Sequence, residues 1–400
     1  MFRKIVLLLV VCLVTSVVSP NVGLADDAIE QDLVPSAIFE EEPVAAIKKV
    51  PFVDATAAIV MDMKSGRVLF EKNSRSQKAI ASTTKIMTAI VAIENGDLND
   101  TVTVSKKAAS IWGSTVGIKE GQEYKLRELL YGLMLNSGND AAIAIAEHIG
   151  GSVEGFVGMM NEKAKALGAM NTSFKTPHGL DMDGHFSTAY DLALITRYAL
   201  QNKTFCSIVG TKRAAIPGKE LLNTNEMLGL YPGADGVKTG FTGQAGRCLV
   251  TSATRNNFKI ISVVLGCPTR AKRAQSSKSI LDYGFVNYKP YKLLAAGEEI
   301  GKIPVIKGIF ENTPVYAADS IEMPLREDEK SSLQREVEWP DSLNAPVSEG
   351  QTVGRLKYTL EGKVIAESEL KIATEVRKKG VLDYLGDIFI EWQRIMRLGI

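Results

Sequence analysis

The sequence predicts an α/β (α+β) fold in which helices flank an antiparallel five-stranded sheet and a helical insert interrupts the strands. Segments with strand-like composition lie at both ends of residues 51–288, two near the start and three near the end. Between them, residues 101–203 carry apolar side chains mostly at helical spacing. Consecutive strands are joined by tight turns, and this excludes a purely parallel sheet.

The first 50 residues are expected to lie outside this fold. Arg3 and Lys4 precede an uninterrupted apolar run, and small residues follow near Ala25. This pattern predicts a secretory signal peptide at residues 1–25, because the apolar run is short for a membrane span. Residues 26–50 carry seven acidic side chains and predict a flexible acidic leader.

The elements of the main domain follow from local patterns. A tight turn that contains Gly66 joins the first two predicted strands, residues 57–63 and 67–70. The apolar spacing after Ser82 predicts a helix that has Ser82 in its first turn and ends near Gly96. Further helices are predicted at residues 126–135, 141–149, 153–167 and 189–200, with loops at 136–139 and 175–179. The last elements predicted are strands at 236–241, 247–253 and 258–265 and a closing helix at 271–283.

Two further parts follow the main domain. Residues 289–376 contain short alternating segments separated by prolines and charges, and they predict a small all-β domain. Residues 377–400 predict an amphipathic helix with Leu385, Ile388 and Trp392 on one face. Such a face is typical of a helix that lies in a membrane interface, and the charges exclude a spanning helix. Packing on the protein's own core is the alternative.

Composition narrows the class of protein. The formal net charge is +1 and no basic, aromatic-interleaved stripe is present, so no nucleic-acid partner is expected. After signal-peptide cleavage the cysteines are Cys206, Cys248 and Cys267, too few for a disulfide framework. Cys248 and Cys267 are expected on neighbouring strands, where one bridge is possible, but buried free thiols are the favoured interpretation.

The first candidate for chemistry is Ser82-Thr83-Thr84-Lys85. A residue and its i+3 neighbour share one helix face, so the Lys85 amine is expected beside the Ser82 hydroxyl. A serine becomes a nucleophile when a neighbouring base takes its proton, and a partly desolvated lysine can do so. The alternative is a helix-capping serine followed by an ordinary solvated lysine.

Two downstream motifs make the catalytic interpretation specific. S-x-x-K, then Ser137-Gly138-Asn139, then Lys238-Thr239-Gly240 form, in this order, the set used by penicillin-interactive serine acyl-transfer enzymes. Ser137 can relay a proton to the leaving amine, and the Asn139 side chain can hold a substrate amide.

The third motif supplies the substrate contacts. Lys238 and Thr239 can bind a substrate carboxylate, and the charge of Lys238 favours the neutral, proton-accepting form of a neighbouring lysine. The strand from Lys238 through Gly240 to Phe241 can align an extended peptide by main-chain hydrogen bonds. Backbone N–H groups of Ser82 and Phe241 are suited to an oxyanion hole.

On these motifs residues 50–285 resemble the low-molecular-mass penicillin-binding proteins of the serine D-alanyl-D-alanine carboxypeptidase family. Residues 177–180 and 185–193, the following β domain and the terminal amphipathic helix are also similar to that family. The resemblance implies a penicillin-binding/β-lactamase-like fold and an acyl-enzyme at Ser82 formed from a peptidoglycan stem pentapeptide. It also implies release of the terminal D-alanine, covalent inhibition by β-lactam antibiotics and a role in cell wall synthesis and remodelling. Export and the terminal helix predict a place at the outer face of the cytoplasmic membrane.

One position departs from the family pattern. A histidine is common after K-T-G in this family, whereas this chain has Phe241. Because only the backbone N–H is needed for the oxyanion, activity is expected to survive, with substrate preference and deacylation rate open to change.

Three other functions are compatible with parts of the sequence: a metal site, a serine β-lactamase and a non-catalytic wall-binding protein. His178, Asp181, Asp183 and His185 have a spacing that could suit a metal, but the context favours a structural loop, and no metal or cofactor is expected. A serine β-lactamase shares two of the motifs; its deacylating glutamate is only faintly matched by Glu220. A non-catalytic wall-binding protein is disfavoured, because a binder needs no nucleophile and base.

Overall fold

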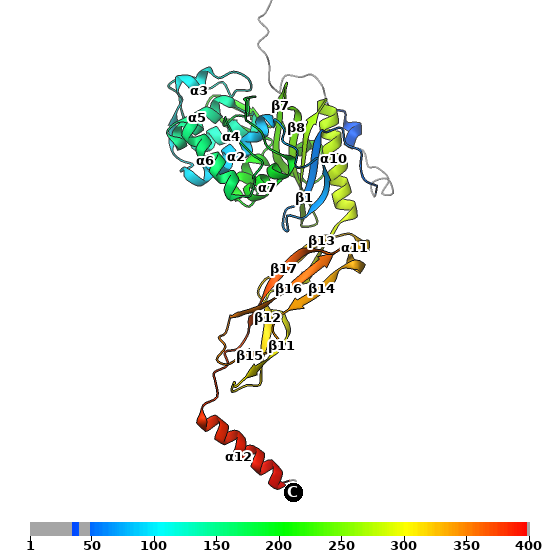
Figure 1. Cartoon of the computed structure of the whole chain (residues 1–400). Helices are drawn as coiled ribbons and strands as arrows, with labels where there is room; N and C mark the ends of the chain where they lie inside the picture. The colour runs from blue at the N-terminus through cyan, green and yellow to red at the C-terminus, as the bar shows by residue number, and fades with distance from the viewer. Residues whose placement is uncertain (1–33, 40–48, 398–400) are drawn as a thin grey trace, which may run out of the picture.

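The computed structural model describes residues 34–39 and 49–397, and these form a chain of three parts (Figure 1). A larger domain with a central sheet is followed by an elongated β domain, and a single helix lies at the far end. The predicted signal peptide, residues 1–25, and much of the predicted leader lie outside the described residues.

The central sheet has five strands in the order β2-β1-β9-β8-β7, and all neighbouring pairs are antiparallel. The fold class predicted from the sequence is therefore confirmed: strands from the two ends of the domain form one sheet. The bounds are β1 Ala57–Asp62, β2 Val68–Lys72, β7 Ala234–Thr242, β8 Gly246–Arg255 and β9 Phe258–Cys267. Strand β7 lies at the edge of the sheet, where it contacts the turn that carries Ser82.

Helices cover both faces of this sheet and create two cores. Helix α10 packs on one face, while α7 and the helical insert pack on the other (Figure 1). The helices are α2 Lys85–Asn95, α3 Lys106–Ser110, α4 Leu126–Leu135, α5 Asn139–Gly150, α6 Val153–Ala166, α7 Ala189–Ala199, α8 Lys203–Val209, α9 Met227–Leu230 and α10 Arg270–Asn287. The four predicted helices of the insert are present with bounds within about two residues. Helix α10 continues to Asn287, beyond the predicted end at residue 283, and Phe285 in this additional turn packs against the second core.

Several short elements have no counterpart in the prediction. Two small hairpins, formed by β3 Thr101–Thr103 with β4 Glu123–Lys125 and by β5 Arg213–Ile216 with β6 Lys219–Leu222, flank the insert. The 3-10 turn η1, Ser36–Phe39, lies within the predicted flexible leader. It contacts α10, and Val34 and Phe39 pack against the second core. This part of the leader is therefore attached to the domain, because its apolar side chains find a hydrophobic surface.

The second domain is built from β-strands, as predicted, with one short helix. Six strands form a sheet in the order β14-β16-β17-β12-β11-β15, and β10 pairs with β13. The bounds are β10 Lys289–Leu294, β11 Glu299–Ile306, β12 Asn312–Ala317, β13 Ile321–Leu325, α11 Glu327–Ser332, β14 Gln334–Glu338, β15 Leu343–Asn344, β16 Thr352–Leu360 and β17 Lys363–Ile372. Its own hydrophobic core includes Ile303, Val315 and Leu356.

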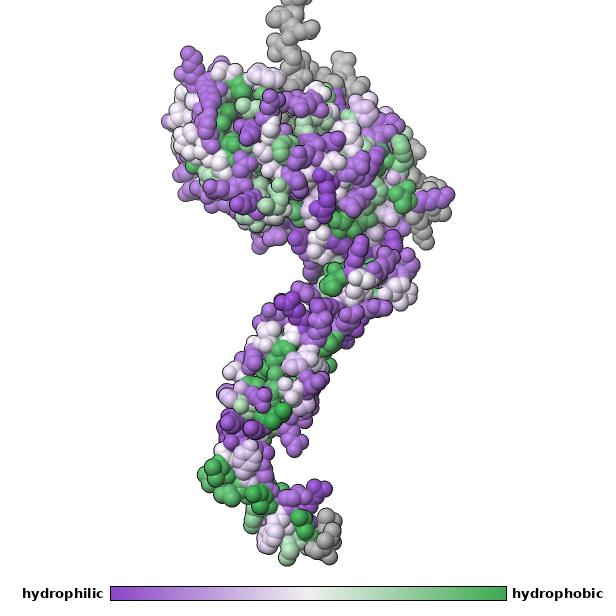
Figure 2. All heavy atoms as spheres, viewed as in Figure 1, coloured by the Kyte–Doolittle hydropathy of each residue, from purple (hydrophilic) through white to green (hydrophobic). Residues whose placement is uncertain are grey.

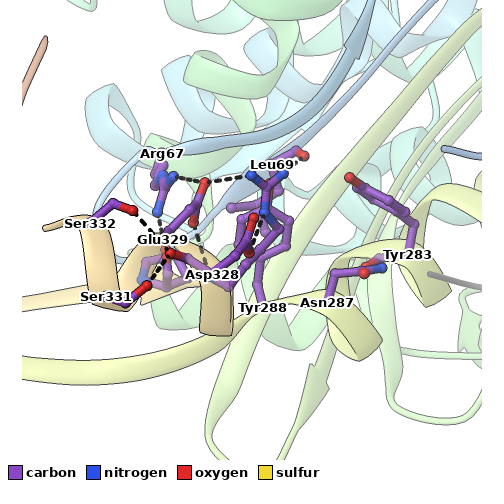
Figure 3. Close-up of polar contacts among 11 residues, drawn as sticks. Arg67, Leu69, Tyr283, Asn287, Tyr288, Asp328, Glu329, Ser331 and Ser332 are labelled. Atoms are coloured by element: carbon purple, nitrogen blue, oxygen red, sulfur yellow. Dashed lines mark hydrogen bonds and ion pairs between the residues drawn. The ribbon is translucent and has the colours of Figure 1, made fainter. Parts of the chain in front are cut away.

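The two domains meet at a polar junction (Figure 3). The Arg67 guanidinium forms an ion pair of 2.7 Å with the Glu329 carboxylate of α11, and both side chains are mostly buried. Arg67 also donates to the Pro324 carbonyl, and its guanidinium lies 5.6 Å from the Tyr288 ring centroid. Tyr288 Oη donates in turn to the Leu69 carbonyl at 3.1 Å. These contacts tie the β1–β2 turn to the second domain.

The terminal helix α12, Val381–Arg397, extends away from both domains (Figure 1). None of its residues is buried, and its apolar residues appear on the molecular surface (Figure 2). The alternative of packing on the protein's own core is therefore not observed. Nowhere in residues 34–39 and 49–397 is a helix both long and apolar enough to cross a membrane.

Candidate active site

The predicted nucleophile lies in a 3-10 turn rather than in an α-helix. Turn η2, Ala81–Thr84, immediately precedes α2. The Thr83 hydroxyl donates to the Ile80 carbonyl at 2.6 Å, and the Thr84 hydroxyl to the Ala81 carbonyl at 2.8 Å. These local hydrogen bonds compete with the α-helical pattern, which explains the difference from the prediction. Because side chains at i and i+3 eclipse in a 3-10 turn, Ser82 still faces Lys85.

Lys85 is completely buried, and its ammonium nitrogen lies 2.9 Å from Ser82 Oγ. The same nitrogen donates to Asn139 Oδ1 at 2.7 Å and to the His178 carbonyl at 2.8 Å. These last two oxygens can only accept hydrogen bonds. In the neutral amine, two N–H groups satisfy them and the lone pair is left to accept the Ser82 proton. The geometry thus suits a proton transfer from Ser82 to Lys85.

The second motif joins this site through Asn139. Asn139 was predicted in a loop but is the first residue of α5. Its side-chain Nδ2 donates to the Trp112 carbonyl at 2.9 Å, while its Oδ1 accepts from Lys85. One Nδ2 hydrogen thus remains for a substrate. Ser137 is buried at the adjoining turn with a φ of 60°, a left-handed conformation that few side chains adopt.

The third motif lies on β7. Lys238 and Thr239 are buried; Lys238 Nζ donates to the Thr239 carbonyl at 3.1 Å, and the Thr239 hydroxyl lies 2.8 Å from that of Thr224. A Cβ atom at Gly240 would lie 2.9 Å from the Ser82 backbone nitrogen. Only glycine therefore allows β7 to approach the nucleophile turn this closely.

Phe241 is half-buried and stacks on an arginine. The Arg247 guanidinium carbon lies 3.9 Å from the Phe241 ring centroid, and the two residues are cross-strand partners of β7 and β8. Arg247 is buried. This cation–π contact holds the aromatic side chain that directly follows the Lys238-Thr239-Gly240 motif.

The histidine-containing loop supports the nucleophile turn. His178 Nδ1 accepts from the Leu180 N–H at 3.1 Å, and His185 Nδ1 accepts from the Lys175 N–H at 3.0 Å. Burial, with a contribution from Lys85, lowers the pKa of His178 to about 3, and burial lowers the pKa of His185 to about 4. Both rings are therefore neutral at pH 7. Asp181, the second residue of the metal-like spacing, accepts a hydrogen bond from the Thr242 hydroxyl at 2.7 Å.

A metal site is not formed by this spacing in the structure. Across residues 34–39 and 49–397 no cluster of three or more histidine, cysteine, aspartate or glutamate side chains could hold a metal ion. The His178 and His185 rings instead accept backbone hydrogen bonds, as described above.

The three cysteines of the described chain are free thiols. Cys248 and Cys267 lie on the neighbouring strands β8 and β9, as expected. Burial, followed by the nearby Cys248, raises the pKa of Cys267 to about 12. The favoured interpretation of buried thiols is confirmed for this pair.

Some of the predicted site residues are in direct contact in the structure. Ser82, Lys85 and Asn139 are linked by hydrogen bonds, and Gly240 lies against the Ser82 backbone. The site also includes the His178 carbonyl, the Thr224 hydroxyl and the Trp112 carbonyl, none of which belongs to a sequence motif. Their roles depend on backbone atoms and long-range packing, for which the sequence carries no local signal.

Comparisons with known proteins agree with this geometry. Residues 44–269 match the family model described as D-alanyl-D-alanine carboxypeptidase. Residues 288–378 match that of the penicillin-binding protein 5 C-terminal domain. The chain belongs to the D-alanyl-D-alanine carboxypeptidase family.

Individual relatives of this carboxypeptidase family cover most of the chain. The D-alanyl-D-alanine carboxypeptidase DacF of Bacillus subtilis is 36% identical over 352 residues, 85% of this chain and 90% of the relative. DacA of Escherichia coli is 33% identical over 364 residues, 86% of this chain and 90% of the relative. The crystal structure of penicillin binding protein 5 from Haemophilus influenzae superposes with a TM-score of 0.75 and 32% identity. It covers 82% of this chain and 99% of that protein.

The residue that faintly resembles a β-lactamase glutamate lies on the surface. Glu220 is exposed on β6, where it is the cross-strand partner of Ala215. An exposed carboxylate has no desolvation or fixed geometry with which to activate a water molecule. Glu220 therefore does not supply the feature that distinguishes class A β-lactamases from this carboxypeptidase family.

Proposed function

We propose that this protein removes the terminal D-alanine from peptidoglycan stem pentapeptides through an acyl-enzyme at Ser82. The observation that carries the proposal is the Lys85 nitrogen, 2.9 Å from Ser82 Oγ and hydrogen-bonded to the Asn139 and His178 oxygens. An amine in this setting can accept the serine proton as the hydroxyl attacks. The family, whose named members are D-alanyl-D-alanine carboxypeptidases, supports this reaction.

The proposed reaction has two steps. Ser82 Oγ attacks the carbonyl carbon of the penultimate D-alanine while its proton passes to Lys85. The C–N bond to the terminal D-alanine breaks, and that amine leaves after taking a proton by way of Ser137. A water molecule then attacks the ester and returns Ser82 to its free form.

The other motif residues orient the substrate in this proposal. Lys238 and the Thr239 hydroxyl bind the terminal carboxylate. The remaining Asn139 Nδ2 hydrogen and the β7 edge along Gly240 and Phe241 hold the peptide backbone. The Ser82 and Phe241 N–H groups stabilise the oxyanion, where one such donor is typically worth about 3 kcal/mol. Penicillins are expected to acylate the same serine.

A labelling experiment tests the nucleophile. The mature protein is treated with a fluorescent penicillin, and a stem pentapeptide of defined sequence is followed by mass spectrometry for loss of one alanine. Ser82→Ala is expected to abolish labelling and to lower turnover at least about a thousandfold. Ser110→Ala, at an exposed serine of α3, is the matched control and should retain both activities.

Two results would contradict the proposal. Covalent labelling of the Ser82→Ala protein would refute Ser82 as the nucleophile. Rapid nitrocefin turnover without alanine release would indicate a β-lactamase, and labelling or binding without any turnover would indicate a wall-binding protein.

We infer further that α12 attaches the protein to the outer face of the cytoplasmic membrane as an interfacial helix. Its exposed apolar residues include Leu385, Ile388 and Trp392, and they project from a helix that packs on neither domain. Arg377 forms a 2.6 Å ion pair with Asp383, and Lys379 a 2.7 Å ion pair with Asp387. Because these cations are paired within the protein, apolar burial is expected to supply most of the binding energy.

Vesicle binding tests this attachment. The mature protein is expected to sediment with phosphatidylcholine vesicles, with little gain from added anionic lipid. Trp392→Glu should lower the bound fraction severalfold, whereas Met170→Glu, at a similarly exposed residue of the catalytic domain, should not. Equal binding of the Trp392→Glu protein would overturn the inference. This attachment and the signal peptide together place the site outside the cell in our proposal.

A further inference from the structure

An exposed tryptophan stands beside the predicted substrate-binding amide. Trp112 has 56% of its surface exposed and follows α3 by two residues. Its carbonyl accepts the 2.9 Å hydrogen bond from Asn139 Nδ2. The backbone of this exposed tryptophan is thus hydrogen-bonded directly to the side chain that is proposed to hold the substrate.

The segment that carries Trp112 is held firmly to the second motif. The Asn139 N–H donates to the Ser114 carbonyl at 2.7 Å. The Asp140 carboxylate accepts from three successive backbone N–H groups, those of residues 116–118, at 2.8 to 3.2 Å. Three hydrogen bonds to one buried carboxylate make a rigid loop, because each is charge-assisted. The backbone that carries the Trp112 indole is therefore held in a fixed position.

Attachment to the membrane does not account for this exposure. Helix α3 lies in the part of the catalytic domain remote from the terminal helix α12 (Figure 1). A lipid surface bound by α12 is therefore not expected to contact Trp112. Substrate is the ligand that the proposed function brings to this position.

The proposed binding mode defines which part of the substrate comes near. In the proposed binding mode, the remaining Nδ2 hydrogen of Asn139 donates to the carbonyl of the amide that precedes the penultimate D-alanine. The carbonyl of that amide belongs to the next residue toward the peptide's N-terminus, and an extended chain advances about 3.5 Å per residue. The side chain of this third residue of the stem is therefore expected to begin near Asn139 and Trp112. The sugar of the peptidoglycan is attached further along the peptide.

We propose that Trp112 is a specificity-determining residue whose indole contacts the aliphatic part of the side chain that precedes the D-alanyl-D-alanine pair. This inference rests on the proposed carboxypeptidase function. A long side chain with several methylene groups buries apolar surface against the ring, while glycine offers none. The protein is thus expected to favour a diamino acid with a long side chain at this position.

Two soluble peptides and three variants test the inference. The substrates are diacetyl-L-lysyl-D-alanyl-D-alanine and acetyl-glycyl-D-alanyl-D-alanine, with kcat/KM measured from D-alanine release. Trp112→Ala is expected to lower kcat/KM roughly tenfold for the lysine peptide and far less for the glycine peptide. Trp112→Phe should restore most of the preference. Phe310→Ala, at a residue 53% exposed in the β domain, is the matched control.

The outcomes separate this inference from the proposed function. An equal fall on both peptides, or no change on either, would overturn the role of Trp112. Absence of D-alanine release by the unaltered protein would refute the carboxypeptidase function itself. Acylation of each variant by 6-aminopenicillanic acid, which lacks the acyl side chain, verifies that Ser82 and its surroundings remain intact.

Discussion

Two buried histidines, His178 and His185, contact the catalytic residues and the turn that carries them. The His178 carbonyl accepts from Lys85 Nζ, and the His185 ring lies 2.9 Å from the Thr84 hydroxyl of the nucleophile turn. Because each Nδ1 accepts a backbone hydrogen bond, each neutral ring carries its hydrogen on Nε2. Protonation at Nδ1 would break these bonds. The loop therefore requires neutral histidines.

This requirement predicts a loss of stability in mild acid. The pKa values of about 3 and about 4 lie below the unfolded value near 6.5, so between these limits the unfolded state binds more protons. The free energy of unfolding should fall as pH decreases from 6.5. Each histidine should contribute about 2 kcal/mol of this loss at pH 5. Urea denaturation at pH 7.5 and pH 5 measures the change.

Substitution identifies the source of the loss. His178→Gln and His185→Gln are expected to be less stable at pH 7.5, and each should show a smaller decrease on going to pH 5. A decrease as large as that of the unaltered protein in both variants would mean that other groups titrate.

At the scale of elements, the site depends on how closely β7 approaches η2. The strand and the turn are in contact, and Gly240 is the point of nearest approach to the Ser82 and Thr83 backbone nitrogens. Gly179 similarly allows the loop before α7 to pass the turn, since a Cβ there would meet the Ala81 carbonyl. Two glycines from different elements thus let three backbone segments converge.

Filling one of these spaces should slow acylation. In Gly240→Ala the added methyl would lie 2.9 Å from the Ser82 nitrogen and 3.1 Å from the Thr83 nitrogen, so β7 must move away from η2. A shift of this kind displaces the proposed oxyanion donor of Phe241, and we expect penicillin acylation to slow by about 10- to 100-fold. Stopped-flow or gel-based labelling gives the rate constant. Gly243→Ala, where a Cβ meets nothing within 4 Å, is the matched control, and an equal effect in both variants would contradict the explanation.

At the scale of the whole molecule, the junction of Figure 3 sets how the catalytic domain sits on the β domain. Arg67 and Glu329 have side-chain exposures of 15% and 8%, whereas the nearby pair of Lys64 and Glu322 has exposures of 64% and 33%. Removal of Arg67 would leave the buried Glu329 carboxylate with Arg326, whose guanidinium lies 3.5 Å away, as its remaining cationic partner. The loss of stability should therefore be smaller than for a buried charge left without any partner, but larger than for an exposed pair. Exposed pairs contribute little. The Arg67 contact should therefore dominate the junction.

Variants at the junction separate orientation from catalysis. Arg67→Ala is expected to lose about 2 kcal/mol of stability and to increase proteolytic cleavage near residue 288, between α10 and β10. Lys64→Ala should lose less than about 1 kcal/mol. Hydrolysis of a small soluble peptide should persist in both variants, because the junction is remote from Ser82. A double-mutant cycle with Glu329→Gln measures the coupling, and a coupling near zero would show that the ion pair does not hold the domains.

Local patterns in the sequence determined the elements and the chemistry. Periodicity and turn residues predicted the five strands, four helices of the insert and the terminal amphipathic helix, because these signals arise between residues close in the chain. The order of the S-x-x-K, S-x-N and K-T-G motifs likewise indicated an acyl-transfer site. Only the tertiary structure decided how the motifs meet. The contact of Lys85 with Asn139 and with the His178 carbonyl spans 54 and 93 positions in the chain, and the approach of β7 to η2 depends on a glycine. Such distances follow from packing of the whole core rather than from any segment, as does the exposure of Trp112 on a loop fixed by Asp140.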